Sequence, residues 1–154
     1  MSRLALVLPL ALIACGPLAH AESVVEYSVR GSFEDVKQML VIAVENHGLV
    51  VNHESKIGEM LERTGKDLGA VKQIYLRAEV LEFCSATLSR QAMEADARLL
   101  AFCPYGIGVY VLPQQADTVH VVYRRPRADG MEAATEALKR VEELLDAIAR
   151  EAVQ

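Results

Sequence analysis

Residues 79–110, EVLEFCSATLSRQAMEADARLLAFCPYGIGVY, carry most of what this sequence says about its fold. Just before this stretch and into it, Ile74, Leu76, Ala78 and Val80 occupy every second position, which suits a strand, and Ile107, Val109 and Val111 do the same after Pro104. Ser85 suits the N-cap of an alanine-rich segment. We therefore predict a strand over residues 75–83, a helix over 86–96 and a strand over 106–112. Residues 70–83 also fit helical spacing, but a run ending at a cysteine and then a capping serine favours the strand.

The segments on either side extend this pattern. Residues 24–30 alternate like a strand, Ser32 can cap a helix that follows Gly31, and Gly48 supplies a left-handed residue where that helix ends. Residues 49–53 and 118–124 are predicted strands, and 55–64 is a short predicted helix. From Met131 onward, apolar residues recur every three or four positions, which indicates an amphipathic helix of about six turns. Its apolar stripe either packs on the sheet or forms a dimer seam.

The predicted order is β-α-β-α-β-α-β-β-α. It indicates the α+β class: a single two-layer domain with a mixed sheet of about five strands covered by helices, and a long C-terminal amphipathic helix. The length of 154 residues is enough for one domain. We assign residues 1–21 to a signal peptide, 22–126 to the α+β domain and 127–154 to the C-terminal helix.

The first residues have the order of a secretory signal: Arg3, a short apolar run, then Ala19-His20-Ala21. Leu12-Ile13-Ala14-Cys15 competes as a lipoprotein cleavage site, which would leave Cys15 lipidated. We favour cleavage after Ala21 because Gly16-Pro17 lies just ahead of it. Both interpretations predict export. Cleavage after Ala21 would release the protein into the periplasm or the medium, whereas lipidation would anchor it to a membrane through Cys15.

Charge and composition argue against two kinds of partner. The net charge is −5 for the whole chain, and loss of Arg3 with the leader makes it −6. An acidic domain has no electrostatic attraction to nucleic acid or to an anionic membrane surface. Aromatic residues make up only 5%, without tryptophan, so a platform for stacking bases is also disfavoured.

Cys84 and Cys103 are the only cysteines outside the leader. In an oxidising compartment two such cysteines most often form a disulfide. If their strands were parallel, the sulfurs would lie on opposite sheet edges, on the order of 15 Å apart and beyond bonding reach. Residues 97–102 could instead carry the chain back. Disulfide, near contact and separate buried thiols therefore all stay open. As a further alternative, the helix after Ser85 would favour a Cys84 thiolate with a lowered pKa, suited to redox or sulfur transfer.

Other candidate residues carry weaker signals. His47, His53 and His120 lack the paired spacing of metal ligands, so we expect no metal, and nothing indicates a cofactor. Arg124 and Arg125, with Arg127 nearby, form either a solvated strand exit or an anion-binding patch. The classical catalytic motifs are missing. The single Gly-x-Gly, at residues 106–108, lies inside a predicted strand, so it does not indicate a phosphate-binding loop. An enzyme is the less favoured class.

The chain resembles the family named domain of unknown function 302. The resemblance rests on Tyr27-Ser28-Val29, Ser32-Phe33, the run from Glu79 to Cys84, and the run from Cys103 to Tyr110. It spans about residues 24–125. It implies a compact α+β fold and, in many members, a homodimer, but no agreed activity. The sequence departs from the family pattern in two places: Cys84-Ser85-Ala86 stands where Cys-Asn-Pro is usual, and Cys103-Pro104 inverts the usual order.

We predict an exported accessory domain that binds a small ligand or a protein partner through a surface of Cys84, Cys103, Pro104 and Tyr105, with Arg124 and Arg125 as further candidates. The first alternative is a thiol-based redox or sulfur-carrying accessory protein that uses Cys84. The second is a structural module that dimerises through the C-terminal helix.

Overall fold

The computed structural model describes residues 23–154, so the signal peptide and Cys15 predictions fall outside the described residues. The predicted order of elements is confirmed, with two short 3-10 helices added. The strands are β1 (Val24–Arg30), β2 (Val51–Ser55), β3 (Arg77–Phe83), β4 (Tyr105–Val111) and β5 (Thr118–Arg124). The helices are α1 (Phe33–Asn46), α2 (Ile57–Asp67), α3 (Ala86–Ala95), η1 (Ala97–Phe102), η2 (Glu132–Ala134) and α4 (Thr135–Glu151).

The five strands form one sheet in the order β1-β5-β4-β3-β2, and every pairing is antiparallel. The α+β class and the five strands are confirmed, but the prediction of a mixed sheet is wrong. The reason lies between β3 and β4. There α3 carries the chain away from the sheet, and η1 returns it to the same end of the strands at which β3 finished. As a result, β4 starts beside the end of β3, and Phe83 is paired with Tyr105.

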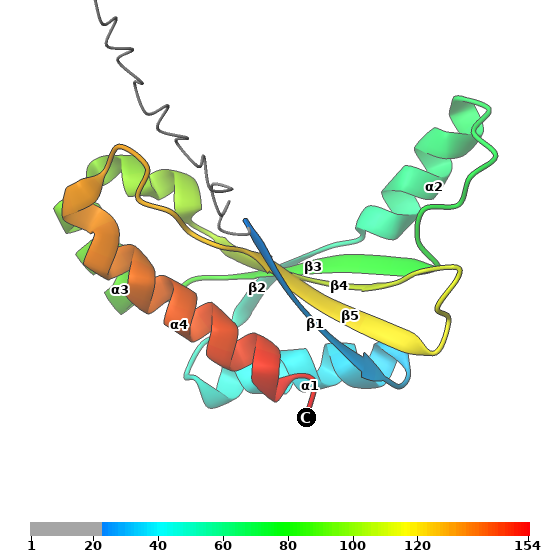
Figure 1. The fold of residues 1–154 in the computed structure, drawn as a ribbon, viewed down its shortest axis with the longest axis horizontal. Helices are drawn as coiled ribbons and strands as arrows, with labels where there is room; N and C mark the ends of the chain where they lie inside the picture. The colour runs from blue at the N-terminus through cyan, green and yellow to red at the C-terminus, as the bar shows by residue number, and fades with distance from the viewer. Residues whose placement is uncertain (1–22) are drawn as a thin grey trace, which may run out of the picture.

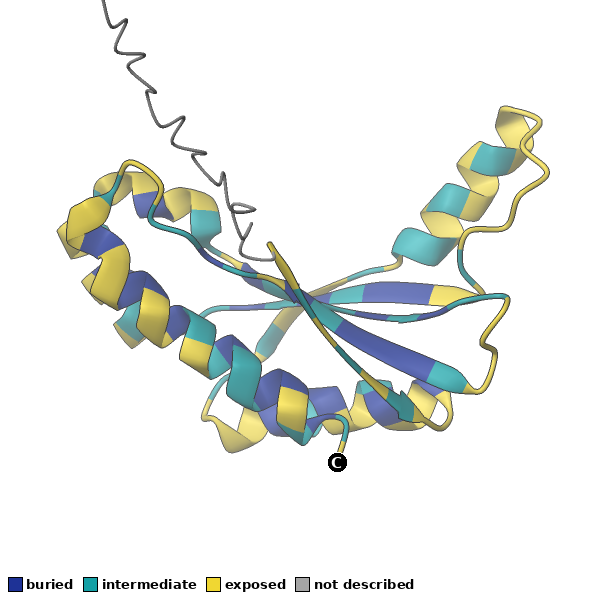
Figure 2. Cartoon of the chain, viewed as in Figure 1, coloured by how far each residue is buried: buried dark blue, intermediate teal, exposed yellow. Residues whose placement is uncertain are grey.

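One face of the sheet is covered by helices and the other is not. Figure 1 shows α1 and α4 on the same side of the sheet, with α3 packed beside the upper half of α4. The buried strand residues, dark blue in Figure 2, lie on β3, β4 and β5, whereas β1 and β2 have only intermediate and exposed residues. The fully buried side chains include Leu40, Val44, Leu81, Phe83, Ile107, Val109, Val119, Val121 and Ile148.

The apolar stripe of α4 forms part of this core. Leu138 and Leu145 are each only 3% exposed, and Ile148 is completely buried. Leu145 and Ile148 belong to the core cluster that includes the sheet, whereas Leu138 packs with α3 and η1 residues in a second cluster. The interpretation that the stripe packs within the domain is confirmed, and it leaves no apolar seam on α4 for a second copy.

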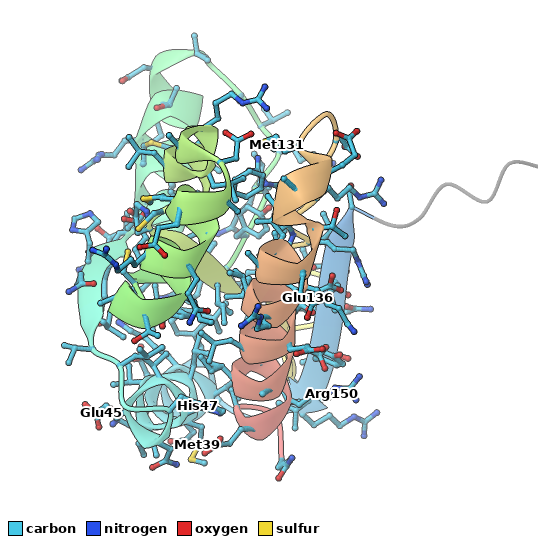
Figure 3. All side chains as sticks on the ribbon, turned by 90° about the vertical axis from the view of Figure 1, so that its left-hand side faces the viewer. Met39, Glu45, His47, Met131, Glu136 and Arg150 are labelled. Carbon is cyan, nitrogen blue, oxygen red and sulfur yellow. The ribbon has the colours of Figure 1, made fainter. Side chains whose placement is uncertain are left out.

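A polar cluster fastens α4 to the sheet. The hydroxyl groups of Tyr27 and Tyr123 both donate to Asp146 Oδ1, at 2.5 and 3.1 Å. Arg150 Nε donates to the other oxygen at 2.6 Å, and its guanidinium lies 4.9 Å from the centre of the Tyr27 ring, on the side of α4 next to β1 (Figure 3). Burial raises the pKa of Asp146, but the hydrogen bonds from Tyr27, Arg150 and Tyr123 outweigh it and hold that pKa below its ordinary value.

None of the helices within residues 23–154 is both long enough and apolar enough to cross a bilayer.

The lowered pKa of Asp146 predicts how stability responds to acid. A carboxylate whose pKa is lower in the folded state stabilises the protein above its unfolded pKa, and this contribution is lost as the pH falls through the folded pKa. We expect Asp146→Asn to lower the free energy of unfolding by about 1–3 kcal/mol at pH 7, as for a hydrogen-bonded charged group. The difference from wild type should shrink below an ordinary pKa of 3.8, measured by urea unfolding.

Glu143→Gln provides the control for that measurement, because Glu143 makes only an exposed ion pair with Lys139 on the same helix, at 3.9 Å. It should change stability little at any pH. An Asp146→Asn effect of the same size at pH 7 and at pH 2.5 would contradict the assigned role of the carboxylate.

Candidate functional site

Cys84 and Cys103 meet at one end of the β3–β4 pair. Cys84 directly follows β3, and Cys103 lies two residues before β4. Because the strands are antiparallel, both cysteines lie at the same end of the β3–β4 pair. The two Sγ atoms lie 2.6 Å apart as free, partly buried thiols. This distance is well inside van der Waals contact for two sulfur atoms. The objection that the sulfurs are out of bonding reach assumed parallel strands and does not hold.

The neighbouring side chains hold the pair in place. The Ser85 hydroxyl caps α3 by accepting from the Leu88 amide at 3.4 Å, which fixes the helix start next to Cys84. One turn later, the Ser89 hydroxyl lies 3.8 Å from Cys103 Sγ and 3.1 Å from the Tyr105 hydroxyl. Ser89 and Tyr105 are buried, and the peptide bond between Cys103 and Pro104 is cis. Cys103 is thus enclosed mainly by α3 and the start of β4.

The electrostatics of Cys84 differ from the sequence prediction. Burial, followed by the hydrogen bond and charge interaction with Cys103, raises the pKa of the Cys84 thiol from an ordinary 9.0 to about 11, despite an opposing backbone hydrogen bond from Tyr105. The prediction of a lowered thiolate pKa is therefore wrong. Burial of the thiol and the neighbouring Cys103 sulfur both raise the pKa of Cys84. Together they outweigh the dipole of α3, which would lower it. At neutral pH the reduced Cys84 is a protonated thiol.

The space beside the sulfurs is small. The hollow lined by Cys103, Ser89, Leu99, Tyr105 and neighbouring apolar residues holds about 10 Å³, no more than is needed for one water molecule. Tyr105 is only 5% exposed, so it forms part of the wall and not an open binding surface. This geometry suits chemistry between the two sulfurs better than the enclosure of a ligand.

The sequence profile of the family described as Domain of unknown function DUF302 matches residues 25–152. The chain belongs to this family. The match continues through α4, beyond the range 24–125 over which the sequence motifs resemble DUF302. The structure is also similar to the "Crystal structure of uncharacterized conserved protein DUF302 from Bacillus stearothermophilus", with a TM-score of 0.72 and 18% identity over 86% of this chain and 99% of the other. At that identity the likeness concerns the fold. No curated protein matches this DUF302 chain.

The arginines at the end of β5 engage separate partners. Arg124 lies over the Phe102 ring, 5.6 Å from its centre. Arg125 Nη1 donates to Glu142 on α4, and its backbone amide donates to Ser23. Because these two guanidinium groups contact different elements, they do not form a paired fork for an anion. Their contacts favour a structural role in tying the strand exit to η1 and α4.

The three histidines within residues 23–154 of this DUF302 chain lie on different elements. His47 pairs with Glu151 at 3.5 Å across the ends of α1 and α4, whereas His53 is on β2 and His120 on β5. Within residues 23–154, no three His, Cys, Asp or Glu side chains cluster closely enough to hold a metal ion.

Sequence reasoning missed a polar cluster on the uncovered face of the sheet. His120 Nδ1 is 3.2 Å from Glu26 Oε1, and its Nε2 is 3.0 Å from the side-chain oxygen of Gln115. The Tyr110 hydroxyl donates to Glu26 Oε2 at 2.5 Å, and its ring stacks on the imidazole at 4.7 Å. Strand alternation could have placed Tyr110 and His120 on polar faces. Only the order of the strands brings Glu26 to them.

The raised pKa of Cys84 gives a prediction for thiol labelling. In reduced protein, the rate of Cys84 alkylation by iodoacetamide should keep rising up to about pH 11, followed by mass spectrometry of the labelled peptide. Cys103→Ser removes a hydrogen bond and a charge that disfavour the thiolate, so the labelling midpoint should move to lower pH. Ser89→Ala is the matched control, because Ser89 contacts Cys103 and not Cys84, and it should shift the midpoint less. A wild-type midpoint near pH 7 would contradict this assignment.

Proposed function

We propose that this chain is an exported accessory protein in which Cys84 and Cys103 are reversibly oxidised to a disulfide. The supporting observation is the 2.6 Å contact between the two sulfur atoms at the shared end of β3 and β4. The N-terminal segment, with its pattern of a secretory signal, is consistent with this proposal because disulfides persist in oxidising compartments. Both cysteines are partly exposed, which allows a small thiol or disulfide to approach.

The reaction is an exchange with an external disulfide. One cysteine thiolate attacks a sulfur of that disulfide, which forms a mixed disulfide and releases one external thiolate. The second cysteine, as thiolate, then displaces the other external thiolate and closes the Cys84–Cys103 bond. The protein gives up two electrons and two protons, and the external disulfide becomes two thiols. Because the pKa of Cys84 is raised, this exchange is slow at neutral pH, which suits a disulfide that changes state rarely and not a fast thiol catalyst.

The bond would act on the structure by closing the loop that contains α3 and η1. The cysteines are 19 positions apart, and a loop of this length stabilises the folded state by about 3 kcal/mol in the chain-entropy model. In the reduced state this segment is held by Ser89, by the apolar contacts of Leu99 and Ala92 with α4, and by the two strand ends.

Binding of a small ligand beside the cysteines has less support, since the hollow there holds about 10 Å³. Dimerisation through α4 also has less support, because its apolar stripe is buried in the core. The reversible disulfide therefore accounts best for this site.

Oxidation should change the stability of the protein by a measurable amount. We expect the oxidised form to exceed the reduced form by about 3 kcal/mol in free energy of unfolding, measured by urea denaturation with and without dithiothreitol. The double variant Cys84→Ser, Cys103→Ser is the matched control, and its stability should not respond to the reductant.

Reversibility is measured separately by alkylating native protein equilibrated with glutathione at varied redox ratios. A single two-electron transition is expected. Two thiols that stay alkylatable with excess oxidised glutathione would overturn the proposal. A bond that is reduced only after unfolding would leave a permanent structural disulfide and would also overturn it.

A further inference from the structure

A hollow of about 610 Å³ lies on the sheet face that the helices leave uncovered. One side of it is the segment that follows α2. This helix projects from the sheet with none of its residues buried (Figure 1), and residues 72–75 line the hollow on the way back to β3. The other side is formed by β1, β4, β5 and the turn after β4. The volume lies in the range of small-molecule binding sites.

The carboxylate of Glu26 is held in one position at the border of this hollow. Its Oε2 accepts from the Tyr110 hydroxyl at 2.5 Å, and its Oε1 lies 3.2 Å from His120 Nδ1. His120 is only 8% exposed, and its other ring nitrogen lies 3.0 Å from the side-chain oxygen of Gln115, so the imidazole is fixed on both sides. Each carboxylate oxygen can accept more than one hydrogen bond. The two contacts therefore orient the carboxylate and leave acceptor capacity for another molecule.

Two tyrosine rings form an aromatic corner beside this carboxylate. The ring centres of Tyr75 and Tyr110 lie 5.4 Å apart, with their planes at 63°. Burial, followed by the hydrogen bond and the charge of Glu26, raises the pKa of Tyr110 well above its ordinary 10.0, so its hydroxyl stays protonated and donates at neutral pH. Ile74 and Val122 add apolar surface to the same border. Aromatic rings bind apolar groups and also attract cations.

The charges at the hollow favour a positive ligand. Among residues 23–154, Glu26 and Lys72 are the only charged residues on its border. Glu26 is fixed by two contacts, whereas Lys72 is exposed on the segment between α2 and β3. An exposed lysine on a flexible stem contributes little binding free energy, because water screens its charge and ordering the side chain costs entropy. The net charge of −5 acts in the same direction as Glu26.

We propose that this hollow binds a small organic cation in which an ammonium group is attached to an aromatic or apolar body. The ammonium group donates to the Glu26 carboxylate, and the body packs on the Tyr75 and Tyr110 rings. The site is separate from Cys84 and Cys103, which lie at the other end of β3. Binding here does not depend on their oxidation.

The test compares three probes that share one aromatic body and differ in charge: phenethylamine, 2-phenylethanol and 3-phenylpropionate. Dissociation constants are measured at neutral pH by titrating isotope-labelled protein and following its amide signals by NMR. The phenethylammonium cation should bind about tenfold more tightly than the neutral alcohol, and the anion should bind most weakly. The amide signals that shift should include those of Glu26, Tyr75 and Tyr110.

Four variants separate the contributions. Glu26→Gln keeps the side-chain size and should bring the affinity for phenethylamine close to that for 2-phenylethanol. Tyr110→Phe keeps the ring but removes a donor that orients the carboxylate, so it should weaken the cation selectively. Tyr75→Ala should weaken all three probes alike. Glu82→Gln is the matched control, because Glu82 lies on the same sheet face without bordering the hollow, and it should leave the three affinities unchanged.

Three results would overturn the proposal: equal affinities of the wild type for the cation and the alcohol, tighter binding of the anion with loss of that binding in Lys72→Ala, or no binding of any probe at millimolar concentration. A cation preference that persists in Glu26→Gln would also contradict it. The Cys84→Ser, Cys103→Ser variant should bind phenethylamine as the wild type does, so the outcome is independent of the redox proposal.

Discussion

The antiparallel pairing of β3 with β4 is the constraint on which the rest of the structure depends. Each strand places alternate residues in the single apolar layer beneath α1 and α4, so a shift of one residue would move Leu81 and Ile107 out of the core. The same pairing determines which chain ends meet. With Phe83 opposite Tyr105, the residues just outside the ladder, Cys84 and Cys103, converge. The sulfur contact follows from strand direction.

The two ends of β3 differ in character. At its C-terminal end the chain is compact: α3, η1 and the start of β4 surround the sulfurs and leave almost no free volume. At its N-terminal end the chain is open, with α2 extending from the sheet and a hollow next to Tyr75. Covalent chemistry within the chain suits the first end. Between these ends, β3 is paired with β4 along its whole length and with β2 only from Val80 to Phe83.

Burial explains why the electrostatic interpretation of Cys84 from sequence was wrong whereas that of the N-cap was right. Ser85 needs only the local start of α3 to accept from the Leu88 amide, and sequence spacing contains that information. The pKa of Cys84 depends on how much water reaches the sulfur and on the charge of Cys103, nineteen positions away. Asp146 is a similar case, since two of its three hydrogen-bond donors, Tyr27 and Tyr123, come from strands distant in sequence.

The sequence by itself determined the elements: the strand at 24–30, the capped helix that follows, the strand that ends at Phe83 and the amphipathic C-terminal helix. Alternation, capping residues and glycines act over a few positions, so local spacing predicts them. Only the tertiary structure decided that all strands are antiparallel, that Glu26 reaches Tyr110 and His120, and that α2 extends without cover. These features depend on the return path of η1 and on strand order. Both are set by how the whole apolar layer packs, which no local pattern contains.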